Sequence, residues 1–333
     1  MKKISAAISL FALLSAMPAI AQEADKPESP SPNAIVDAAP ASEWVTISPS
    51  DLLVMDLAPD AKGEARRVVI QLMPEPFSQG WIRNIRKLAA AKFWDGTSIN
   101  RVQDNYVVQW GDAGYDNPES GETEQKALPE GLETVPESAY ITPMTDDMVT
   151  NGIATHIIDQ ASNDDYFPSN GTDPYINETS VMAGWPFGFA EEGVSPVHCY
   201  GAVGVGRNYS PDTGSGTELY TVIGHAPRHL DRNIAVVGRV IEGIEHLSSL
   251  PRGKGQLGFY AGASKRVPIT SIRLGDALGD GSVPAFEYLD TNSDVFAQYA
   301  DARANRRDPF FIKPAGGADI CNIPVPVRRT KVE

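Results

Sequence analysis

The stretch that decides the fold runs from Phe93 to Asp112 and reads FWDGTSINRVQDNYVVQWGD. Its Asp95-Gly96 pair predicts a turn. Residues 100–109 then predict a strand, a turn and a second strand. Arg101 lies in the first of these strands, and an arginine in such a place is ordinarily a surface residue unless its surroundings give it another role.

The residues before this stretch predict a β-hairpin and a helix. Residues 52–57 and 67–72 are apolar runs rich in β-branched side chains, and residues 60–63 between them carry turn signals. Over residues 77–92 the apolar side chains recur at three- and four-residue spacing, which predicts an amphipathic helix.

The residues after this stretch differ in character. Residues 113–197 are dense in Asp, Glu, Asn, Gly, Pro and Ser, which predicts a long loop-rich insertion instead of a second domain. Four strand patterns follow, at residues 201–205, 219–223, 234–240 and 269–274. Residues 241–244 are expected to open a short helix, and residues 294–307 a polar helix capped by Asn292 or Ser293. The class is therefore mainly β with a few helices, and the many short strands favour a barrel or a sandwich.

The composition is that of a folded protein with an acidic surface. The chain has 333 residues, of which 42% are hydrophobic and 21% charged, and its formal net charge is −15. The apolar content excludes a disordered chain, and 29 Gly with 26 Pro are too few for a collagen-like one. The negative charge disfavours nucleic acid and anionic membrane surfaces as partners.

The N-terminus has the pattern of a bacterial secretory signal peptide. Two lysines precede the apolar run of residues 4–17, which is short for a membrane span, and residues 19–21 (Ala-Ile-Ala) form a small-x-small cleavage site. We therefore expect residues 1–21 to be removed and the mature protein to be periplasmic, with no membrane segment; an uncleaved anchor is the alternative. Residues 22–42, rich in Ala, Pro, Ser, Glu and Asp, are expected to form a flexible linker.

The chain has two cysteines, Cys199 and Cys321, which excludes a four-cysteine metal site and a dense disulfide scaffold. In an oxidising compartment the two could form a disulfide that ties the C-terminal tail to the core. Two buried free thiols are the alternative.

Motifs for metal or nucleotide chemistry are lacking from the sequence. The five His form no HExxH pair, and Pro227 between His225 and His229 argues against a helical pair of ligands. There is no GxSxG nucleophile elbow and no GxxxxGK[ST] phosphate loop. We expect neither a metal nor a cofactor.

The stretch from Phe93 to Asp112 resembles the cyclophilin family of peptidyl-prolyl isomerases, whose pattern is F-Y-D-G-x-x-F-H-R-V, a short loop, and F-M-x-Q-G-G-D. A second block agrees in order and spacing. GAVGVGR at residues 201–207 resembles the bacterial G-T-V-G-M-A-R strand, and residues 211–220 resemble the P-x-x-x-x-S-Q-F-F segment. Residues 229–243 resemble W-L-D-x-x-x-x-F-G-x-V-x-x-G, and residues 68–88 resemble the family's second strand and first helix.

The resemblance implies a closed antiparallel β-barrel of about eight strands, capped by two helices. The cyclophilin-like domain would cover residues 43–275 with the insertion at residues 113–197, and residues 276–333 would form a C-terminal extension packed on it. The implied reaction is cis–trans rotation about X–Pro bonds of proline-containing polypeptides. Such an enzyme holds the proline in an apolar pocket and stabilises the twisted amide with a guanidinium.

The resemblance also assigns roles to individual residues. Arg101 matches the catalytic arginine, and Gln109 matches the glutamine that bonds the substrate backbone and orients the arginine. Gly206 and Arg207 match strand residues beside the bound peptide. The residues that match the apolar pocket are Tyr106, Val107, Leu219, Tyr220 and Leu230. Without the resemblance, Gln109 could be an ordinary strand residue and the apolar ones could be core.

The sequence departs from the family pattern at four places that bear on the groove. Ile99-Asn100 replaces the usual Phe-His before the arginine. Glu218 stands where Gln is common, so its carboxylate could pair with Arg101 or favour basic peptides. His229 replaces a Trp at the pocket rim, and Ile234 replaces the pocket's usual His or aromatic residue.

We predict a peptidyl-prolyl isomerase that acts on exported proteins. The alternative is a cyclophilin-fold binding module or chaperone that holds proline-containing segments with little turnover. Glu218, Ile234 and the insertion motivate that alternative, because each could make the pocket less complete or cover it.

Overall fold

The computed structural model describes residues 29–114, 118–145, 173–176, 178–279 and 281–330. The predicted signal peptide, residues 1–21, lies outside these ranges. Eight of the strands form a closed antiparallel barrel, in which β9 pairs with β10. In order of pairing they are β10 (Leu219–Val222), β5 (Val107–Gly111), β4 (Ser98–Val102), β12 (Val267–Leu274), β2 (Leu52–Leu57), β3 (Arg66–Leu72), β11 (Val236–Glu242) and β9 (Ala202–Val205).

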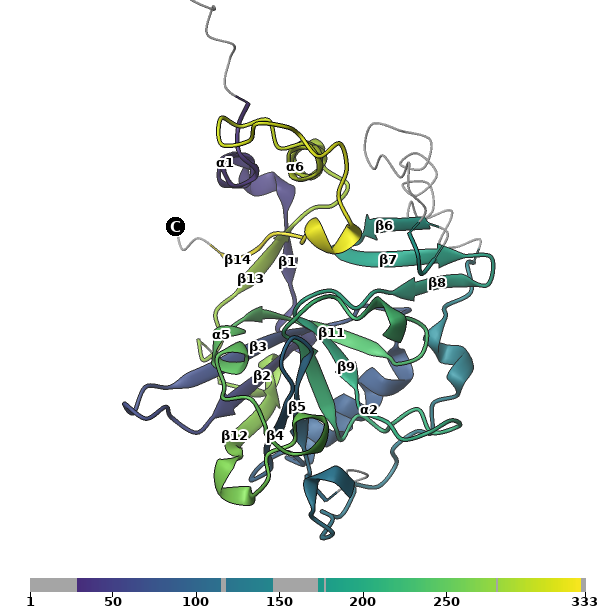
Figure 1. Cartoon of the computed structure of the whole chain (residues 1–333), viewed down its shortest axis with the longest axis vertical. Helices are drawn as coiled ribbons and strands as arrows, with labels where there is room; N and C mark the ends of the chain where they lie inside the picture. Colours follow the sequence, from purple (N-terminus) through teal and green to yellow (C-terminus); the bar gives the residue numbers. More distant parts are fainter. Residues whose placement is uncertain (1–28, 115–117, 146–172, 177, 280, 331–333) are drawn as a thin grey trace, which may run out of the picture.

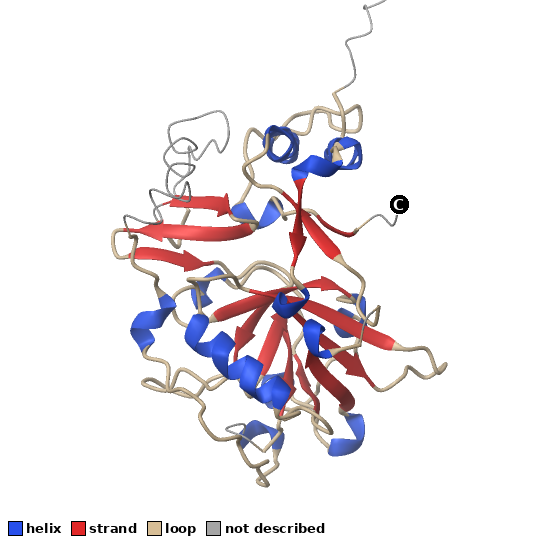
Figure 2. Cartoon of the chain, turned by 180° about the vertical axis from the view of Figure 1, so that it is seen from behind, coloured by secondary structure: helices blue, strands red, loops and turns tan. Residues whose placement is uncertain are grey.

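The barrel confirms the predicted class, mainly β with a closed barrel and helices on it. The predicted hairpin is β2 paired with β3, in register from Leu52 opposite Gln71 to Leu57 opposite Arg66. The predicted amphipathic helix is α2 (Gln79–Ala90), which Figure 2 shows lying across the strands. Its buried face carries Trp81, Ile82, Ile85 and Leu88.

A second, short helix, α5 (Glu245–Ser248), starts later than the sequence predicts. Residues 241 and 242 still belong to β11, and Gly243 ends the strand with a φ of +82°. A side chain at Gly243 would also lie 2.1 Å from the carbonyl oxygen of Arg67 in β3, so glycine is required there. The helix therefore begins only after this close approach, and its Leu247 is buried in the barrel core.

The insertion contains a three-stranded sheet that the sequence analysis does not predict. It consists of β6 (Glu178–Met182), β7 (Trp185–Ala190) and β8 (Gly193–Pro196). Ala183 and Gly184, with φ angles of +48° and +82°, form the two-residue turn between β6 and β7. Both residues have the positive φ of the tight hairpin turns, but alanine is not a usual residue there, so the turn is hard to recognise from sequence.

The C-terminal extension packs on the domain and shares a second three-stranded sheet with the start of the folded chain. This sheet contains β1 (Trp44–Ile47), β13 (Phe286–Leu289) and β14 (Val327–Arg329). Figure 1 shows both three-stranded sheets on one side of the barrel. The predicted polar helix is α6 (Asp294–Ala304), and Ser293 is its N-cap.

Part of the segment expected to be a flexible linker is folded. Helix α1 (Pro32–Ala38) begins with a proline in its first turn, and the hydroxyl of Ser31 accepts a hydrogen bond from the N–H of Ala34. Ile35 and Val36 of α1 pack in the same apolar cluster as Phe296 of α6. Burial of these few apolar side chains overrides a polar composition that favours a linker.

Nine short 3₁₀ helices connect the larger elements of the described chain. They are η1 (Ala41–Glu43), η2 (Pro49–Asp51), η3 (Pro118–Ser120), η4 (Glu137–Tyr140), η5 (Arg228–Leu230), η6 (Gln256–Gly258), η7 (Ala263–Lys265), η8 (Gly275–Ala277) and η9 (Ile320–Asn322). Within the described ranges no helix has the length and apolar character to cross a membrane.

The predicted disulfide is confirmed: Cys199, just after the insertion, is bonded to Cys321 in η9. The bond spans 122 residues and fixes the C-terminal extension to the barrel side of the molecule.

Replacing Cys199 and Cys321 together by serine should lower the free energy of unfolding by roughly 2–5 kcal/mol, because the unfolded chain regains the entropy of a long closed loop. Urea denaturation of the oxidised wild type and of the double variant measures the difference. The reduced wild type is the control. If the reduced wild type and the double variant both have the free energy of unfolding of the oxidised protein, the bond does not hold the extension in place.

Candidate active site in a groove on the barrel

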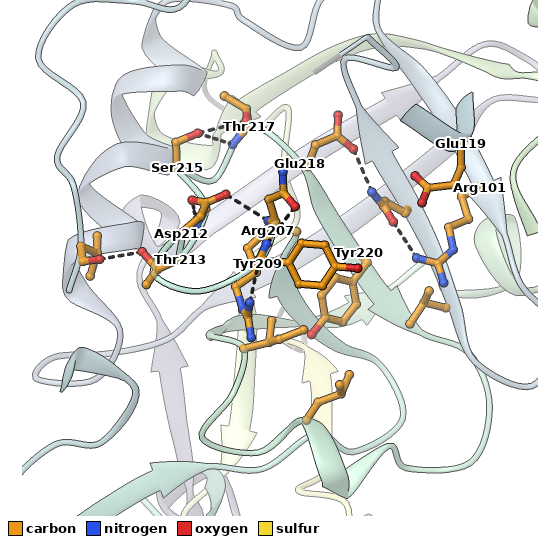
Figure 3. A pocket seen from close by; sticks show the side chains of 18 of the residues that line it. Arg101, Glu119, Arg207, Tyr209, Asp212, Thr213, Ser215, Thr217, Glu218 and Tyr220 are labelled. Atoms are coloured by element: carbon orange, nitrogen blue, oxygen red, sulfur yellow. Dashed lines mark hydrogen bonds between the residues drawn. The ribbon is translucent and has the colours of Figure 1, made fainter. Parts of the chain in front are cut away.

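A groove with a volume of about 760 Å³ opens on the outside of the barrel at β4, β5 and β10. Nine of the eleven groove residues selected from the sequence line it, as follows: Arg101, Tyr106, Val107, Gln109, Gly206, Arg207, Glu218, Tyr220 and Leu230. Figure 3 shows Arg101 and Glu119 on one side of the groove and Asp212 and Thr213 on the other. The residues that the sequence selects are thus brought together from three separate parts of the chain.

A β-bulge places Arg101 on the groove face. β4 and β5 pair with Ile99 opposite Trp110 and with Arg101 opposite Gln109, so Asn100 is an extra residue on β4. An inserted residue of this kind re-aims the side chains that follow it. Ile99 is fully buried in the core, whereas Arg101 is half-buried at the groove.

The guanidinium of Arg101 is held by three hydrogen bonds. Its Nε–H donates to the carbonyl oxygen of Leu257 at 2.8 Å, and its Nη1 donates to Oε1 of Gln109 at 3.0 Å. Its Nη2 donates to Oε1 of Gln103. Three acceptors in different directions fix both the position and the plane of the guanidinium, which a lysine could not reproduce.

Two aromatic rings flank the same guanidinium. The centre of the Phe259 ring lies 5.6 Å from Cζ of Arg101, and that of the Tyr106 ring lies 5.7 Å away. Phe259 is placed by a bridge between its backbone and that of Arg101, on the side of β4 away from β5. Burial lowers the pKa of Arg101 below its usual value, while the charge of Glu119 opposes this effect. An arginine still stays protonated, so the groove holds a permanent, partly dehydrated cation.

Gln109 connects Arg101 to the carboxylate of Glu218. Nε2 of Gln109 donates to Oε2 of Glu218 at 3.1 Å, while its oxygen accepts from Arg101. Because the amide can orient in one way only between a cation and an anion, this contact assigns its oxygen and nitrogen. Glu218 is buried with 4% of its surface exposed, and Gly111 makes room for it: a Cβ at Gly111 would lie 2.3 Å from Oε1 of Glu218.

The apolar part of the groove lies next to Arg101. Val107 and Tyr220 are buried there, and Leu230 and Ile234 are half-buried. The Tyr220 side chain crosses the backbone of β9 at Gly204, where a Cβ would lie 2.3 Å from the tyrosine hydroxyl. Burial raises the pKa of Tyr220 well above its ordinary value, so this ring stays neutral.

Two of the residues selected from the sequence do not line the groove. Leu219 is fully buried in the barrel core, because it pairs with Trp110 and its side chain points to the opposite face from Tyr220. Its assignment to the substrate pocket is therefore wrong. His229 is exposed beside the groove, with its ring stacked on Tyr106 at 6.5 Å between centroids.

Gly206 and Arg207 lie at the groove, but their polar groups are already engaged. The N–H of Gly206 donates to the carbonyl oxygen of Glu218 at 2.8 Å. The guanidinium of Arg207 donates to the carbonyl oxygens of Asn233 and Asn208. Arg207 thus braces the loop at one end of the groove.

The insertion supplies one wall of the groove. From the sequence alone, the insertion is expected only to cover the pocket or to make it less complete. Leu128, Leu132 and Val135 line this wall. Asn84 in α2 is fully buried and holds the wall through two hydrogen bonds with the backbone of Glu133. Its Nδ2 donates to the carbonyl oxygen, and its Oδ1 accepts from the N–H. Gly80 of α2 lets Val135 approach, since a Cβ there would lie 2.8 Å from that side chain.

The glutamate of this wall is fixed by two cations of α2. Arg83 makes a two-pronged contact with the Glu133 carboxylate, and Nζ of Lys87 lies 3.4 Å from it. These contacts lower the pKa of Glu133 to about 2, so the carboxylate remains charged over the physiological range. Phe259, Leu257 and Glu119, which also line the groove, carry no sequence signal of their own.

Comparison with known proteins identifies the family of the chain. The model of the family described as cyclophilin type peptidyl-prolyl cis-trans isomerase/CLD matches residues 61–274. The crystal structure of the cyclophilin AquaCyp293 from Hirschia baltica superimposes with a TM-score of 0.55 at 18% identity, covering 87% of this chain and 95% of that one. No curated protein sequence matches the chain.

A cyclophilin type peptidyl-prolyl cis-trans isomerase of Cryptosporidium parvum, solved in the presence of the dipeptide Ala-Pro, is a more distant structural match. Its TM-score is 0.36 at 9% identity, with coverage of 66% of this chain and 98% of that one.

Replacing Gly204 by alanine should destabilise the protein by about 1–3 kcal/mol, because the new methyl group and the Tyr220 ring cannot occupy the same space. Urea denaturation of the variant measures the loss. Gly262→Ala is the matched control, since a Cβ there would meet nothing within 4 Å. Equal stability of the two variants would contradict the position assigned to Tyr220.

Proposed function

The chain belongs to the cyclophilin-type peptidyl-prolyl cis-trans isomerase family, and on this basis we propose that Arg101 is its catalytic residue and that exported proteins are its substrates. The enzyme class follows from the family match over residues 61–274. The observation that carries the assignment of the residue is the fixed guanidinium of Arg101 beside an apolar pocket.

The reaction needs no covalent chemistry. Rotation about an X–Pro bond has a barrier of about 18–20 kcal/mol, because the amide loses its conjugation on the way. In the twisted state the proline nitrogen becomes basic, and a donor aimed at it lowers the barrier. A site for this reaction therefore requires an apolar seat for the proline ring and a cationic donor beside it.

The groove provides both parts. Val107, Tyr220, Leu230 and Ile234 line the apolar seat. Of the five N–H groups of an arginine, three make the hydrogen bonds described above to Leu257, Gln109 and Gln103. Within the described part of the chain two N–H groups are left for the substrate, and they are held in a fixed direction.

Gln109 has a positioning role in this proposal. Its oxygen accepts from Arg101 while Glu218 accepts from its nitrogen, so the anion orients the amide that holds the guanidinium. Glu218 therefore supports the arginine through Gln109. Its buried negative charge lies in the wall of the groove and favours substrates with a basic residue near the proline.

Export is supported by two features of the chain. The N-terminal pattern of residues 1–21 is that of a secretory signal peptide. The disulfide between Cys199 and Cys321 fits an oxidising compartment, and in a bacterium that compartment is the periplasm. The substrates would then be proline-containing segments of proteins folding after export.

A binding module with little turnover is the second candidate. It is favoured by the insertion wall at residues 128–135, which covers one side of the groove and could hold a peptide too firmly for rapid exchange. This candidate keeps peptide binding and differs only in the rate of isomerisation.

Arg101→Ala should reduce kcat/KM for an X–Pro peptide by about 10²- to 10³-fold, because the donor to the twisted amide is lost. A protease-coupled isomerisation assay measures the rate. Arg101→Lys is the matched control: it retains the charge but loses the three-point fixation, and should recover only a small part of the activity. A wild type no faster than Arg101→Ala would reject the enzymatic role and leave the binding module.

Glu218→Gln should lower kcat/KM for peptides with lysine next to proline by about 3- to 10-fold and change that for neutral peptides much less. The new amide oxygen can still accept from Gln109, so Arg101 stays in place. A peptide series that varies only the residue before proline gives the ratio. An equal decrease for lysine and alanine peptides would mean that Glu218 acts only by supporting Gln109.

A further inference from the structure

A buried chain of polar groups ends at the hydroxyl of Tyr220, behind the apolar seat of the groove. Nε2 of His198 lies 2.9 Å from this hydroxyl, and Nδ1 of His198 lies 2.8 Å from Oδ1 of Asp231. His198 has no exposed surface, and Asp231 is 5% exposed. Neither residue lines the groove, and the mechanism above uses neither.

The directions of these hydrogen bonds follow from the partners. Oδ1 of Asp231 accepts from the backbone N–H of His198 at 2.9 Å, and an ionised carboxylate can only accept, so Nδ1 of the ring carries a proton. For a neutral ring Nε2 is then an acceptor, and the hydroxyl of Tyr220 donates to it. The tyrosine hydroxyl is therefore fixed in direction as well as in position.

Asp231 is itself fixed from the far side. Its Oδ2 accepts from Nε of Arg228 at 2.5 Å, and Arg228 is 4% exposed. The other end of that guanidinium contacts Asp173 of the insertion at 2.8 Å and lies 4.0 Å from Asp319 of the C-terminal extension. The chain of polar groups is thus anchored where the insertion and the extension meet the barrel.

We propose that His198 is a positioning residue of the groove: held by Asp231, it fixes the Tyr220 ring at the depth and tilt that the proline seat requires. Glycine at position 204 opens the space for this ring, but an open space alone does not determine where the ring stays. The hydrogen bond to His198 determines the position of the ring, because it holds the hydroxyl end of the ring. This inference rests on the proposed function, since it concerns the seat for proline.

The test uses two substitutions of His198 that separate its two bonds. His198→Asn places an amide near the position of Nδ1 and retains a donor to Asp231, but it is too short to reach Tyr220. His198→Gln is the matched control, because its amide reaches the position of Nε2 and can pair with the hydroxyl. Peptide exchange by NMR at increasing concentration of a short peptide with one X–Pro bond gives KM and kcat separately.

We expect His198→Asn to raise KM by about 3- to 10-fold, the factor for one lost hydrogen bond, with a smaller change in kcat. His198→Gln should stay within about twofold of the wild type in KM, since the bond is replaced. In a Tyr220→Phe background there is no hydroxyl to hold, so His198→Asn should leave KM at the value of that background. If His198→Asn raises KM by the same factor in both backgrounds, it acts on the fold in general and the proposal is wrong.

Two further measurements keep the result decisive. If wild type shows no exchange, the proposed function fails, but the same variants are compared by the Kd of the peptide from a chemical-shift titration, with the same expected factors. If a variant does not fold, ¹⁵N spectra of the wild-type histidines decide the question. A neutral His198 with its proton on Nδ1 agrees with the proposed hydrogen bonds to Asp231 and Tyr220, and a proton on Nε2 alone overturns the proposal.

Discussion

The interaction on which the site depends is the hydrogen bonding of the Arg101 guanidinium to Gln103, Gln109 and the backbone of Leu257. A free arginine side chain samples many rotamers, and aiming its donors at a reacting amide requires that this freedom be removed beforehand. The bulge at Asn100, the amide of Gln109 and the backbone at Leu257 achieve this fixation together. The barrel is thus a rigid frame in which one charged donor is kept in a single orientation beside an apolar seat.

The insertion and the C-terminal extension are both joined to this frame. The insertion is fixed on α2 through the amide of Asn84 and forms a wall of the groove. The extension is joined by the disulfide of Cys321. Asp173 of the insertion and Asp319 of the extension also lie beside Arg228, which holds Asp231. The segments that are outside the barrel therefore shape or support the same face that carries Arg101.

Much of this arrangement could be predicted from the sequence. The apolar runs of the sequence coincide with the eight barrel strands. The family resemblance relates Gln109 to Arg101, and the structure places the two opposite each other. The other parts carry no comparable signal. The hairpin of the insertion turns on Ala183, an unusual residue for that position, and helix α1 depends on contacts with α6, a segment over 250 residues away. The sequence does not show that Leu219 lies in the core, because two adjacent strand residues point to opposite faces and only the register with Trp110 shows which one is inside.

The most direct test of the account is the rate at which the protein interconverts the cis and trans forms of a single X–Pro peptide, observed by NMR exchange at a catalytic concentration of the chain with its disulfide intact. We expect exchange cross-peaks between the two isomers, with an exchange time well below the tens to hundreds of seconds of the free peptide. Binding of the peptide, seen as shifted resonances, without any faster exchange would contradict the account and show a groove that holds proline without turning it.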